Sequence, residues 1–434
     1  MKGDCLSQVE SALEPLDVDE LARQTGFCRR KAKKLTPLIF VRSCCLLLGS
    51  KKISLRNWAI IIGVLINQTY AKQSLFERIR AQAALFVRSV VLGLVGHLSL
   101  GEQQRALPPA LDAFKRVLIE DSTILTLAKK LMRFFRGGRN QHGSQGGMLR
   151  VQGYYDLKHE CFIHFSHSAF VRNDLTLAGE VLRLLRAGDL LIRDLGYLVL
   201  EVLRRIKAKG AFFLSRFKHN LAVYEPGGQS LDLVSLLSHR TRPLDKDVLL
   251  GAKEQLPVRL VAVRVSEEVA NLRRHNARKN RHFHPTKKHL LLLGWDLLIT
   301  NASREQLPTK LVAKVYGLRF HIETIFKAWK SHFFLEDLPN GSKAQVESLL
   351  YARLLLITIF EVRFLARWDY QIQDRAGPLS VLKLAGFMQL YLPVALLAEL
   401  QNNLEEALQK QVAYHCTYEK RRSRKNFIEK LELT

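Results

Sequence analysis

One stretch of this sequence, from Tyr316 to Lys330, restricts the possible folds and functions more than any other. Its apolar residues recur at the spacing of a helix, about 100° per residue, and would gather on one broad face that packs into a core. They are Leu318, Ile322, Ile325, Phe326 and Trp329. The narrow opposite face would carry one phenol, one carboxylate and three cations, at Tyr316, Arg319, Glu323, Lys327 and Lys330.

The polar face of this helix has two interpretations. A carboxylate such as Glu323 can hold a divalent cation through oxygen, and Arg or Lys side chains beside it can hold phosphates. Phosphodiester chemistry on a polyanion needs both. The alternative is a solvated helix face with Glu–Lys pairs four residues apart. The helix alone does not decide between them.

The charge of the chain favours the first interpretation. Its 434 residues include 67 Lys and Arg against 40 Asp and Glu, a net charge of +27. A protein this basic is expected to have a polyanionic partner, with nucleic acid as the first candidate and an anionic membrane surface as the second. The length predicts two or three domains, and 47% hydrophobic residues are enough for sizeable cores.

Cysteine usage and hydrophobic runs predict a cytoplasmic protein that does not cross a membrane. The six cysteines, of which Cys44 and Cys45 are adjacent, form no Cys-x-x-Cys pair, which indicates buried reduced thiols. The N-terminus lacks the charged-then-apolar layout of a signal peptide. Runs such as Trp58–Ile66 and Leu290–Ile299 are too short to span a bilayer and are interpreted as a buried helix and a buried strand.

Residues 1–105 are predicted to form a helical, DNA-binding N-terminal domain. Helical spacing continues through Leu38–Leu48, Leu55–Gln68 and Ile79–Leu98. Before them, an amphipathic segment from Asp17 is followed by a Gly break and a basic cluster that ends at Lys34, which resembles a small helix-turn-helix. Any helical hairpin with a Gly turn has a similar pattern.

Residues 106–215 are predicted to form an α/β core. The pattern gives a strand before Asp121, a hairpin, a helix over Leu175–Arg186, a strand before Asp194, a further helix and a last strand. This order describes a mixed sheet flanked by helices. Asp121 and Asp194 would lie at strand ends, where open α/β sheets form their sites. Glu120 is the alternative to Asp121, but neighbouring strand residues point to opposite faces.

Residues 216–307 are predicted to be a β-rich insertion, with strands near Leu221–Glu225, Val258–Val265 and Leu290–Ile299. The basic segment 273–288 is interpreted as a DNA-facing loop. The alternative is a solvated hairpin tip. His282 and His284 of this segment lack a Cys or a third ligand at a metal-binding spacing. Residues 308–375 would complete the core, and 376–434 would form a helical C-terminal region with a basic tail.

The spacing of Tyr316, Arg319, Glu323 and Lys330, Y-x2-R-x3-E-x6-K, resembles the Y-R-E-K signature of bacterial insertion-sequence transposases of the DDE class, the insertion-sequence four family. The resemblance extends to the segments around the two aspartates, Ile119–Asp121 and Ile192–Tyr197. The long interval between Asp194 and Glu323 is similar to the β-rich insertion of these proteins, and the N-terminal segment is similar as well.

This resemblance implies an RNase H-like core in which Asp121, Asp194 and Glu323 form an acidic triad that holds two Mg²⁺ ions, with Mn²⁺ as a substitute. It also implies that a set of residues on the signature stretch contacts DNA phosphates near the transposon end. By carry-over these are Tyr316, Arg319 and Lys330, and the helical wheel adds Lys327. The expected partners are double-stranded DNA and a second copy of the chain, paired on that DNA, in the nucleoid of a bacterial cytoplasm.

Two other classes of function stay open. The chain could be a catalytically inactive or domesticated DNA-binding relative, or a host nuclease of the same fold. Other acids of the core, Asp156, Asp174 and Asp189, are predicted to be surface or capping residues. Trp295 lies in an apolar run and is predicted to be part of the core rather than a receptor for a flipped base.

Overall fold

The computed structural model describes residues 12–98 and 109–397, apart from short gaps at 31, 48–50, 52, 67, 140–144, 172–173, 280–283 and 366–378. The described chain divides into two compact units. The first unit comprises residues of 1–105, 122–171 and 321–397, and the second comprises residues of 106–121 and 172–320. The predicted basic tail, with Cys5 and Cys416, lies outside the described residues.

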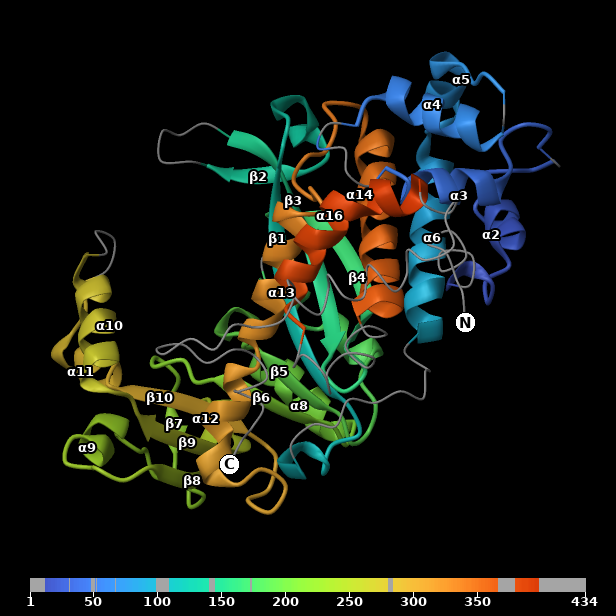
Figure 1. Cartoon of the computed structure of the whole chain (residues 1–434). Helices are drawn as coiled ribbons and strands as arrows, with labels where there is room; N and C mark the ends of the chain where they lie inside the picture. The colour runs from blue at the N-terminus through green and yellow to red at the C-terminus, as the bar shows by residue number, and fades with distance from the viewer. Residues whose placement is uncertain are drawn as a thin grey trace. The chain divides into compact units, whose positions relative to one another are not determined.

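Helices and a small antiparallel sheet build the first unit (Figure 1). Its N-terminal part is helical, as predicted. The helices are α2 (Val18–Gln24), α3 (Pro37–Cys45), α4 (Leu55–Leu65), α5 (Lys72–Arg78) and α6 (Ala81–Leu98). Strands β2 (Arg136–Arg139), β3 (Gln145–Asp156) and β4 (Cys161–Ala169) pair antiparallel. Later come α13 (Phe320–Ser331), α14 (Lys343–Ile359), the π-helix η5 (Phe360–Leu365) and α16 (Val381–Leu397).

Two aromatic clusters form the core of the first unit. Phe27 stacks on Phe86 at 4.7 Å between ring centroids, and Phe40 stacks on Trp58 at 5.4 Å. Under the sheet, Trp329 of α13 lies 4.8 Å from Phe162 of β4, also measured between ring centroids. Large aromatic side chains bury much apolar surface, so these clusters hold the N-terminal helices together and fix α13 to the strands.

Antiparallel and parallel strands form one sheet in the second unit, in the order β1-β5-β6-β10-β9-β8-β7. The strands are β1 (Val117–Leu127), β5 (Leu190–Arg193), β6 (Phe212–Arg216), β7 (Val223–Tyr224), β8 (Leu244–Leu250), β9 (Leu256–Arg264) and β10 (Trp295–Thr300). The helices include α7 (Asp174–Leu177), α8 (Leu200–Ala208), α9 (Leu233–Leu237), α10 (Glu267–Lys279), α11 (Lys287–Leu292) and α12 (Thr309–Gly317).

The predicted mixed α/β architecture is confirmed. Strand β1 contributes residues 117–121 to the second unit, where β5 and β6 run parallel to it. Its residues 122–127 belong to the first unit, where β3 is its neighbour and β4 follows β3. The strand succession β4-β3-β1-β5-β6 is the order expected of an RNase H-like core, and helices α6 and α8 pack against strands β4 and β6, respectively.

The β-rich insertion extends the core sheet rather than forming a separate one. Strand β10 pairs antiparallel with β6, and β9 and β8 continue the sheet on its other side. Where Leu290–Ile299 was predicted to be a strand throughout, its first residues belong to α11 and only its end belongs to β10. The reason is a helix start at Thr286, whose side-chain hydroxyl accepts a hydrogen bond from the backbone N–H of His289.

The basic segment 273–288 was predicted to be a loop between strands, and this prediction is also wrong. Its first half belongs to helix α10, which begins with Glu267 and Glu268 and ends with Arg278 and Lys279. Acids in the first turn and cations in the last turn stabilise the helix dipole. The sequence carried this start and stop signal, but the strand-like runs on both sides of it favoured a hairpin.

Two further predicted helices differ in detail. The amphipathic helix over Leu175–Arg186 is broken into the short α7 and a 3-10 turn at Glu180–Arg183, with Gly179 between them. The connection between α2 and α3 spans residues 25–36, which is longer than the turn of about three to four residues in a DNA-binding helix-turn-helix.

Among the described residues, no single helix has the length and apolar character needed to cross a membrane. Helices α5 and α6 together have that length and apolar character, but they are bent by 75° relative to each other.

Candidate active site

The parallel pairing of β1 and β5 places Asp121 and Asp194 at the same edge of the second unit's sheet. Glu120 is in register with Arg193, so Asp121 and Asp194 each follow the last paired residue of their strands. Carboxyl ends of neighbouring parallel strands meet at one edge, which is where open α/β sheets place their sites. Asp194 directly follows β5, as predicted, whereas Asp121 lies inside β1, which continues to Leu127, so its predicted place at a strand end is wrong.

Glu120 points away from Asp121 and is already paired. Its side chain is fully buried and lies 2.7 Å from the guanidinium of Arg193, which is also fully buried. Arg193 further donates a hydrogen bond of 3.0 Å to the carbonyl of Ala178. Because successive strand residues face opposite sides of the sheet, Asp121 lies on the face opposite to the buried Glu120. The alternative in which Glu120 is the ligand does not fit this arrangement.

Arg319 lies between the two aspartates. Its Nη1 donates a hydrogen bond of 3.2 Å to Oδ2 of Asp121, and its Nε is 3.8 Å from Oδ1 of Asp194. The arginine is 7% exposed and its guanidinium lies 4.6 Å from the ring centroid of Phe320. One buried cation therefore neutralises two carboxylates that would otherwise repel each other.

Tyr316 also turns toward this pair. Its hydroxyl donates a hydrogen bond of 3.4 Å to Oδ1 of Asp194. Burial raises the pKa of the Tyr316 phenol to about 12, so the hydroxyl stays protonated at neutral pH and acts as a donor. The guanidinium of Arg216 lies 5.6 Å from the centroid of the same ring. This contact was not predicted, because Arg216 lies a hundred residues before Tyr316 in the sequence.

The signature stretch is two helices rather than one, which corrects the sequence prediction. Helix α12 ends at Gly317 and α13 begins at Phe320, with Leu318 and Arg319 between them. Tyr316 and Arg319 were predicted on an exposed polar face, yet they are only 5% and 7% exposed. The break at Arg319 removes both residues from the helical wheel on which that face was drawn.

Helix α13 itself has the predicted two faces within the first unit. Glu323 in its first turn and Lys327 one turn later are exposed, whereas Ile325 and Trp329 are buried. Lys330 is half-buried, and its ammonium lies 2.6 Å from the carboxylate of Glu336 and 3.0 Å from the carbonyl of Ile124. Lys330 thus joins α13 to strand β1 three residues after Asp121.

The predicted site residues are therefore divided between the two units. Asp121, Asp194, Tyr316 and Arg319 come together in the second unit, and Glu323, Lys327 and Lys330 belong to the first. Within each unit, the described His, Cys, Asp and Glu side chains form no group of three or more that could hold a metal ion. The complete triad stays a prediction.

The other acids of the core are more buried than predicted. Asp189 is fully buried and forms a 2.5 Å ion pair with Arg116. Asp156 caps a turn, as predicted, by accepting a hydrogen bond from the backbone N–H of Lys158, but it is only 1% exposed. Asp174 begins α7. Both buried acids are engaged by neighbours and are poor candidates for a cation site.

The core assignments for Trp295 and the cysteines are confirmed. Trp295 of β10 is 7% exposed. The four described cysteines, Cys28, Cys44, Cys45 and Cys161, are free and buried. Burial raises the pKa of the Cys45 thiol to about 12, so this thiol is unreactive at neutral pH.

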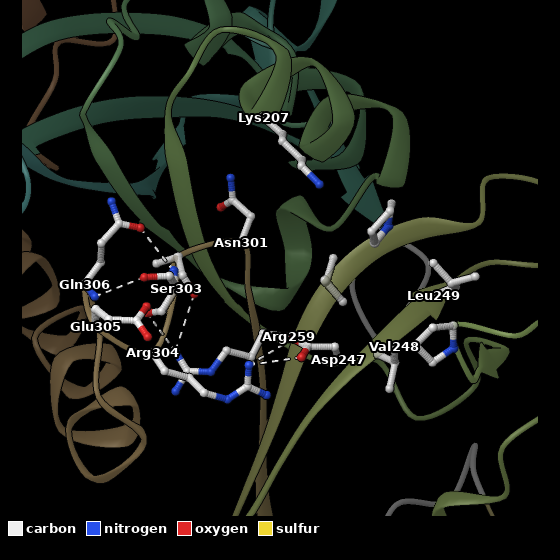
Figure 2. A pocket seen from close by; sticks show the side chains of 14 residues that line it. Lys207, Asp247, Val248, Leu249, Arg259, Asn301, Ser303, Arg304, Glu305 and Gln306 are labelled. Atoms are coloured by element: carbon white, nitrogen blue, oxygen red, sulfur yellow. Dashed lines mark hydrogen bonds and ion pairs between the residues drawn. The ribbon is translucent and has the colours of Figure 1, made fainter.

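A pocket of about 490 Å³ opens in the second unit. It lies at the opposite ends of the strands from the two aspartates. Figure 2 shows Lys207, Asn301, Arg304 and Asp247 on its walls. Asn301 binds the start of β6, accepting from the N–H of Phe213, and Arg304 pairs with Asp247 at 3.0 Å. Its polar groups are largely paired with each other, and no predicted site residue lines it.

Comparison with known proteins gives the class of this molecule. Residues 112–359, more than half of the chain, match the transposase DDE domain family. The chain belongs to this family and is a DNA transposase.

Its relatives are transposases of insertion sequences. It is 26% identical over 427 residues to the transposase for insertion sequence element IS231F of Bacillus thuringiensis subsp. israelensis, covering 92% of this chain and 88% of that one. It is 26% identical over 404 residues to the IS231B transposase of Bacillus thuringiensis subsp. berliner, covering 87% and 83%. A solved piggyBac transposase synaptic complex with hairpin DNA overlaps 96% of this chain and 86% of that chain, with a TM-score of 0.44 and 11% identity.

Proposed function

We propose that this transposase cleaves and joins the DNA ends of an insertion sequence by metal-dependent phosphodiester chemistry at Asp121, Asp194 and Glu323. One observation carries the proposal: the carboxylates of Asp121 and Asp194 converge on the single guanidinium of Arg319. Two acids brought to one point repel each other unless a cation lies beside them; Arg319 is that cation in the DNA-free chain, and in our proposal a divalent ion takes this role in the reaction.

The donor set suits a hard divalent cation. The side chains of Asp121 and Asp194 are 18% and 42% exposed, which leaves room for water and substrate oxygens beside carboxylate ligands. Mg²⁺ prefers such a mixture of carboxylate, water and phosphate oxygens. We infer two Mg²⁺ ions, with Mn²⁺ as a substitute, and Glu323 as the third ligand. When bound, the ions would activate the attacking oxygen and stabilise the leaving oxygen.

The residues around the aspartates would position the acids and the DNA. The Tyr316 hydroxyl orients the Asp194 carboxylate through its hydrogen bond. Arg319 neutralises both acids in the DNA-free chain, and it would be available to a DNA phosphate when divalent ions are bound to those acids. Lys327, exposed on α13, and Lys330 would contact phosphates on the same DNA. Tyr316 and Arg319 would do so at the reacting end.

We further propose that the chain belongs to the Y-R-E-K group, the insertion-sequence four family, because the residues of that signature are present at its spacing. The substrate would be the inverted repeats at the ends of the element, followed by target DNA, in the cytoplasm of a bacterium. Two copies of the chain would pair on two ends. A chain with a net charge of +27 repels its own copy, and DNA would neutralise that repulsion.

Neutral isosteres of the acids test the catalytic proposal. Asp121→Asn, Asp194→Asn and Glu323→Gln should each retain end binding and lose cleavage by at least about 100-fold, because the charge that holds the cation is removed. Asp112→Asn, which alters an exposed acid of the second unit, is the control and should cleave at the wild-type rate. Near wild-type nicking by one of the three variants would show that this residue is not a ligand.

The same assays separate the alternatives. An inactive relative would bind the ends of the element without cutting them when Mg²⁺ is added. A host nuclease would cut but would form no strand-transfer products. Light scattering with and without end DNA, at matched ionic strength, tests the pairing. One protein bound to one end under cleavage conditions would contradict the paired arrangement, whereas a stable dimer without DNA would contradict only the role of charge.

A further inference from the structure

Helix α10 exposes apolar side chains to solvent. Val269 and Leu272 are 40% and 60% exposed, and 60% is the largest value of any large hydrophobic side chain in the part of the chain that the structure describes. His275 and Asn276 follow about one turn later and are exposed as well. At about 100° per residue, Leu272, His275 and Asn276 project from one side of the helix, and the buried Ala270 lies on the other.

The inner side of α10 is firmly attached to the second unit. Arg273 forms a 2.8 Å ion pair with Asp296 of β10. Arg274 donates a 3.2 Å hydrogen bond to the carbonyl of Leu290 in α11 and pairs with Glu267 at 2.7 Å. Figure 1 shows α10 and α11 beside each other next to the end of β10. The exposed side is therefore presented on a fixed support, as a recognition surface needs to be.

Positive charge surrounds the C-terminal end of this surface. Arg278 and Lys279 are exposed in the last turn of α10, and Lys287 is exposed at the start of α11. At the other end of the same side lies one exposed acid, Glu268. An apolar and amide-bearing helix face bordered by cations complements a DNA groove, which offers base edges between two rows of phosphates.

We propose that α10 lies in the major groove of duplex DNA at the end of the element, with Leu272, His275 and Asn276 facing the bases and Arg278 and Lys279 on phosphates. This inference rests on the proposed function in one respect: that function identifies the bound DNA as the end of the element. An Asn side chain can form two hydrogen bonds to adenine, and an aliphatic side chain can contact the methyl group of thymine. The groove, about 12 Å wide, admits one helix.

The charge argues for DNA rather than a protein partner. The cores of protein interfaces are poor in lysine and other charged residues, whereas this surface has three cations at one end. The whole chain carries a net charge of +27. A protein occupant of α10 is therefore an outcome of the test that would overturn the proposal.

Binding of the full chain to two duplexes, measured by fluorescence anisotropy without divalent ions, tests this surface. One duplex carries the inverted repeat that flanks the gene, and the other is scrambled. Arg278→Ala combined with Lys279→Ala should reduce the slope of log K against log salt by about two on both duplexes. Asn276→Ala should reduce the preference for the inverted repeat about tenfold. Glu268→Lys should strengthen binding to both about fivefold.

Matched controls come from elsewhere in the second unit. Lys209→Ala combined with Lys253→Ala removes the same charge from exposed positions and should leave the slope nearly unchanged. Leu175→Ser is the control for Leu272→Ser, since Leu175 is 49% exposed. The Leu272 variant should lower the preference for the inverted repeat, and the Leu175 variant should not.

Three results would overturn the proposal. The first is a wild-type salt slope in the Arg278 and Lys279 double variant. The second is an equal loss of affinity for both duplexes in Asn276→Ala, which would show that α10 does not distinguish bases. The third is a change of oligomeric state in Leu272→Ser with unchanged DNA binding, which would assign the surface to a protein partner. Because binding is measured without metal, each result is independent of whether the acidic triad cleaves DNA.

Discussion

The guanidinium of Arg319 donates a 3.2 Å hydrogen bond to the carboxylate of Asp121, one of the two acids proposed to hold the catalytic cations. The same side chain lies 3.8 Å from Asp194. Arginine is never deprotonated in proteins, so this cation occupies the space between the two acids at any physiological pH. A divalent cation at the same carboxylates would have to compete with it.

Arg319→Ala should therefore raise the affinity for Mn²⁺ in the absence of DNA. We expect a change of roughly fivefold, which corresponds to about 1 kcal/mol for a partly exposed ion pair. Isothermal titration calorimetry on the DNA-free protein measures it, with Asp121→Asn as the control that should lose affinity. A weaker or unchanged affinity in Arg319→Ala would contradict competition between Arg319 and the metal ion.

Lys327 and Lys330 should differ in a way that separates phosphate contact from structural support. Lys327 is exposed, so Lys327→Ala should reduce the salt slope of end binding by about one without changing the melting temperature. Lys330 pairs with Glu336, so Lys330→Ala should also lower the melting temperature by about 2 °C. Calorimetry and anisotropy on the same preparations measure both. A wild-type slope in Lys330→Ala would leave this lysine a structural role only.

The buried pair of Glu120 and Arg193 should contribute strongly to stability once one partner is missing. Glu120→Gln leaves the Arg193 guanidinium buried without its counter-charge, and loss of one partner of such a pair typically costs about 3–5 kcal/mol. Thermal unfolding measures the loss. Replacing both residues by Met should restore most of the stability, because the buried charges are removed together. A double variant no more stable than Glu120→Gln would show that packing, rather than charge, dominates at this position.

Glu361 should make the stability of the protein depend on pH. Burial raises the pKa of this carboxyl, which accepts a 3.3 Å hydrogen bond from Trp329 Nε1, to about 8 from the ordinary 4.5. The folded state therefore retains a proton that the unfolded state releases between pH 4.5 and pH 8. Stability falls as pH rises through this window, by up to several kcal/mol, and is level above it.

Glu361→Gln removes the titrating group and should flatten this dependence. We expect the variant to melt at a higher temperature than the wild type at pH 8.5, with a smaller difference at pH 5. Differential scanning calorimetry at the two pH values measures it. Glu347→Gln, which alters a half-buried acid of α14, is the control. Equal shifts of the wild type and Glu361→Gln between the two pH values would contradict a titration of Glu361.

Local patterns in the sequence predicted the parts of the site that depend on local structure. Asp121 and Asp194 follow short apolar runs, and both runs belong to buried strands that pair in parallel, although only Asp194 lies at a strand end. The burial of α13 follows its own periodicity, so Ile325 and Trp329 were assigned to the core. These predictions needed no knowledge of distant residues.

The remaining features depend on partners far away along the chain. Periodicity runs through Gly317 and Leu318 without interruption, so the break before Arg319 is not visible as a change of pattern. Asp189 is buried because Arg116 pairs with it from 73 residues away. Arg319 meets Asp121 across 198 residues. A single sequence contains no signal for such pairings.

The pair of Glu120 and Arg193 also determines which of two neighbouring acids occupies the position of the proposed catalytic carboxylate. Two acids are adjacent in β1, and a shift of that strand by one residue would exchange them, so that Glu120 would be exposed and Asp121 buried. The shifted strand would offer Arg193 a side chain one methylene shorter, and the guanidinium would lose its 2.7 Å contact in a place without water. The salt bridge therefore disfavours the shifted register and keeps Asp121, the proposed metal ligand, on the face opposite to Arg193.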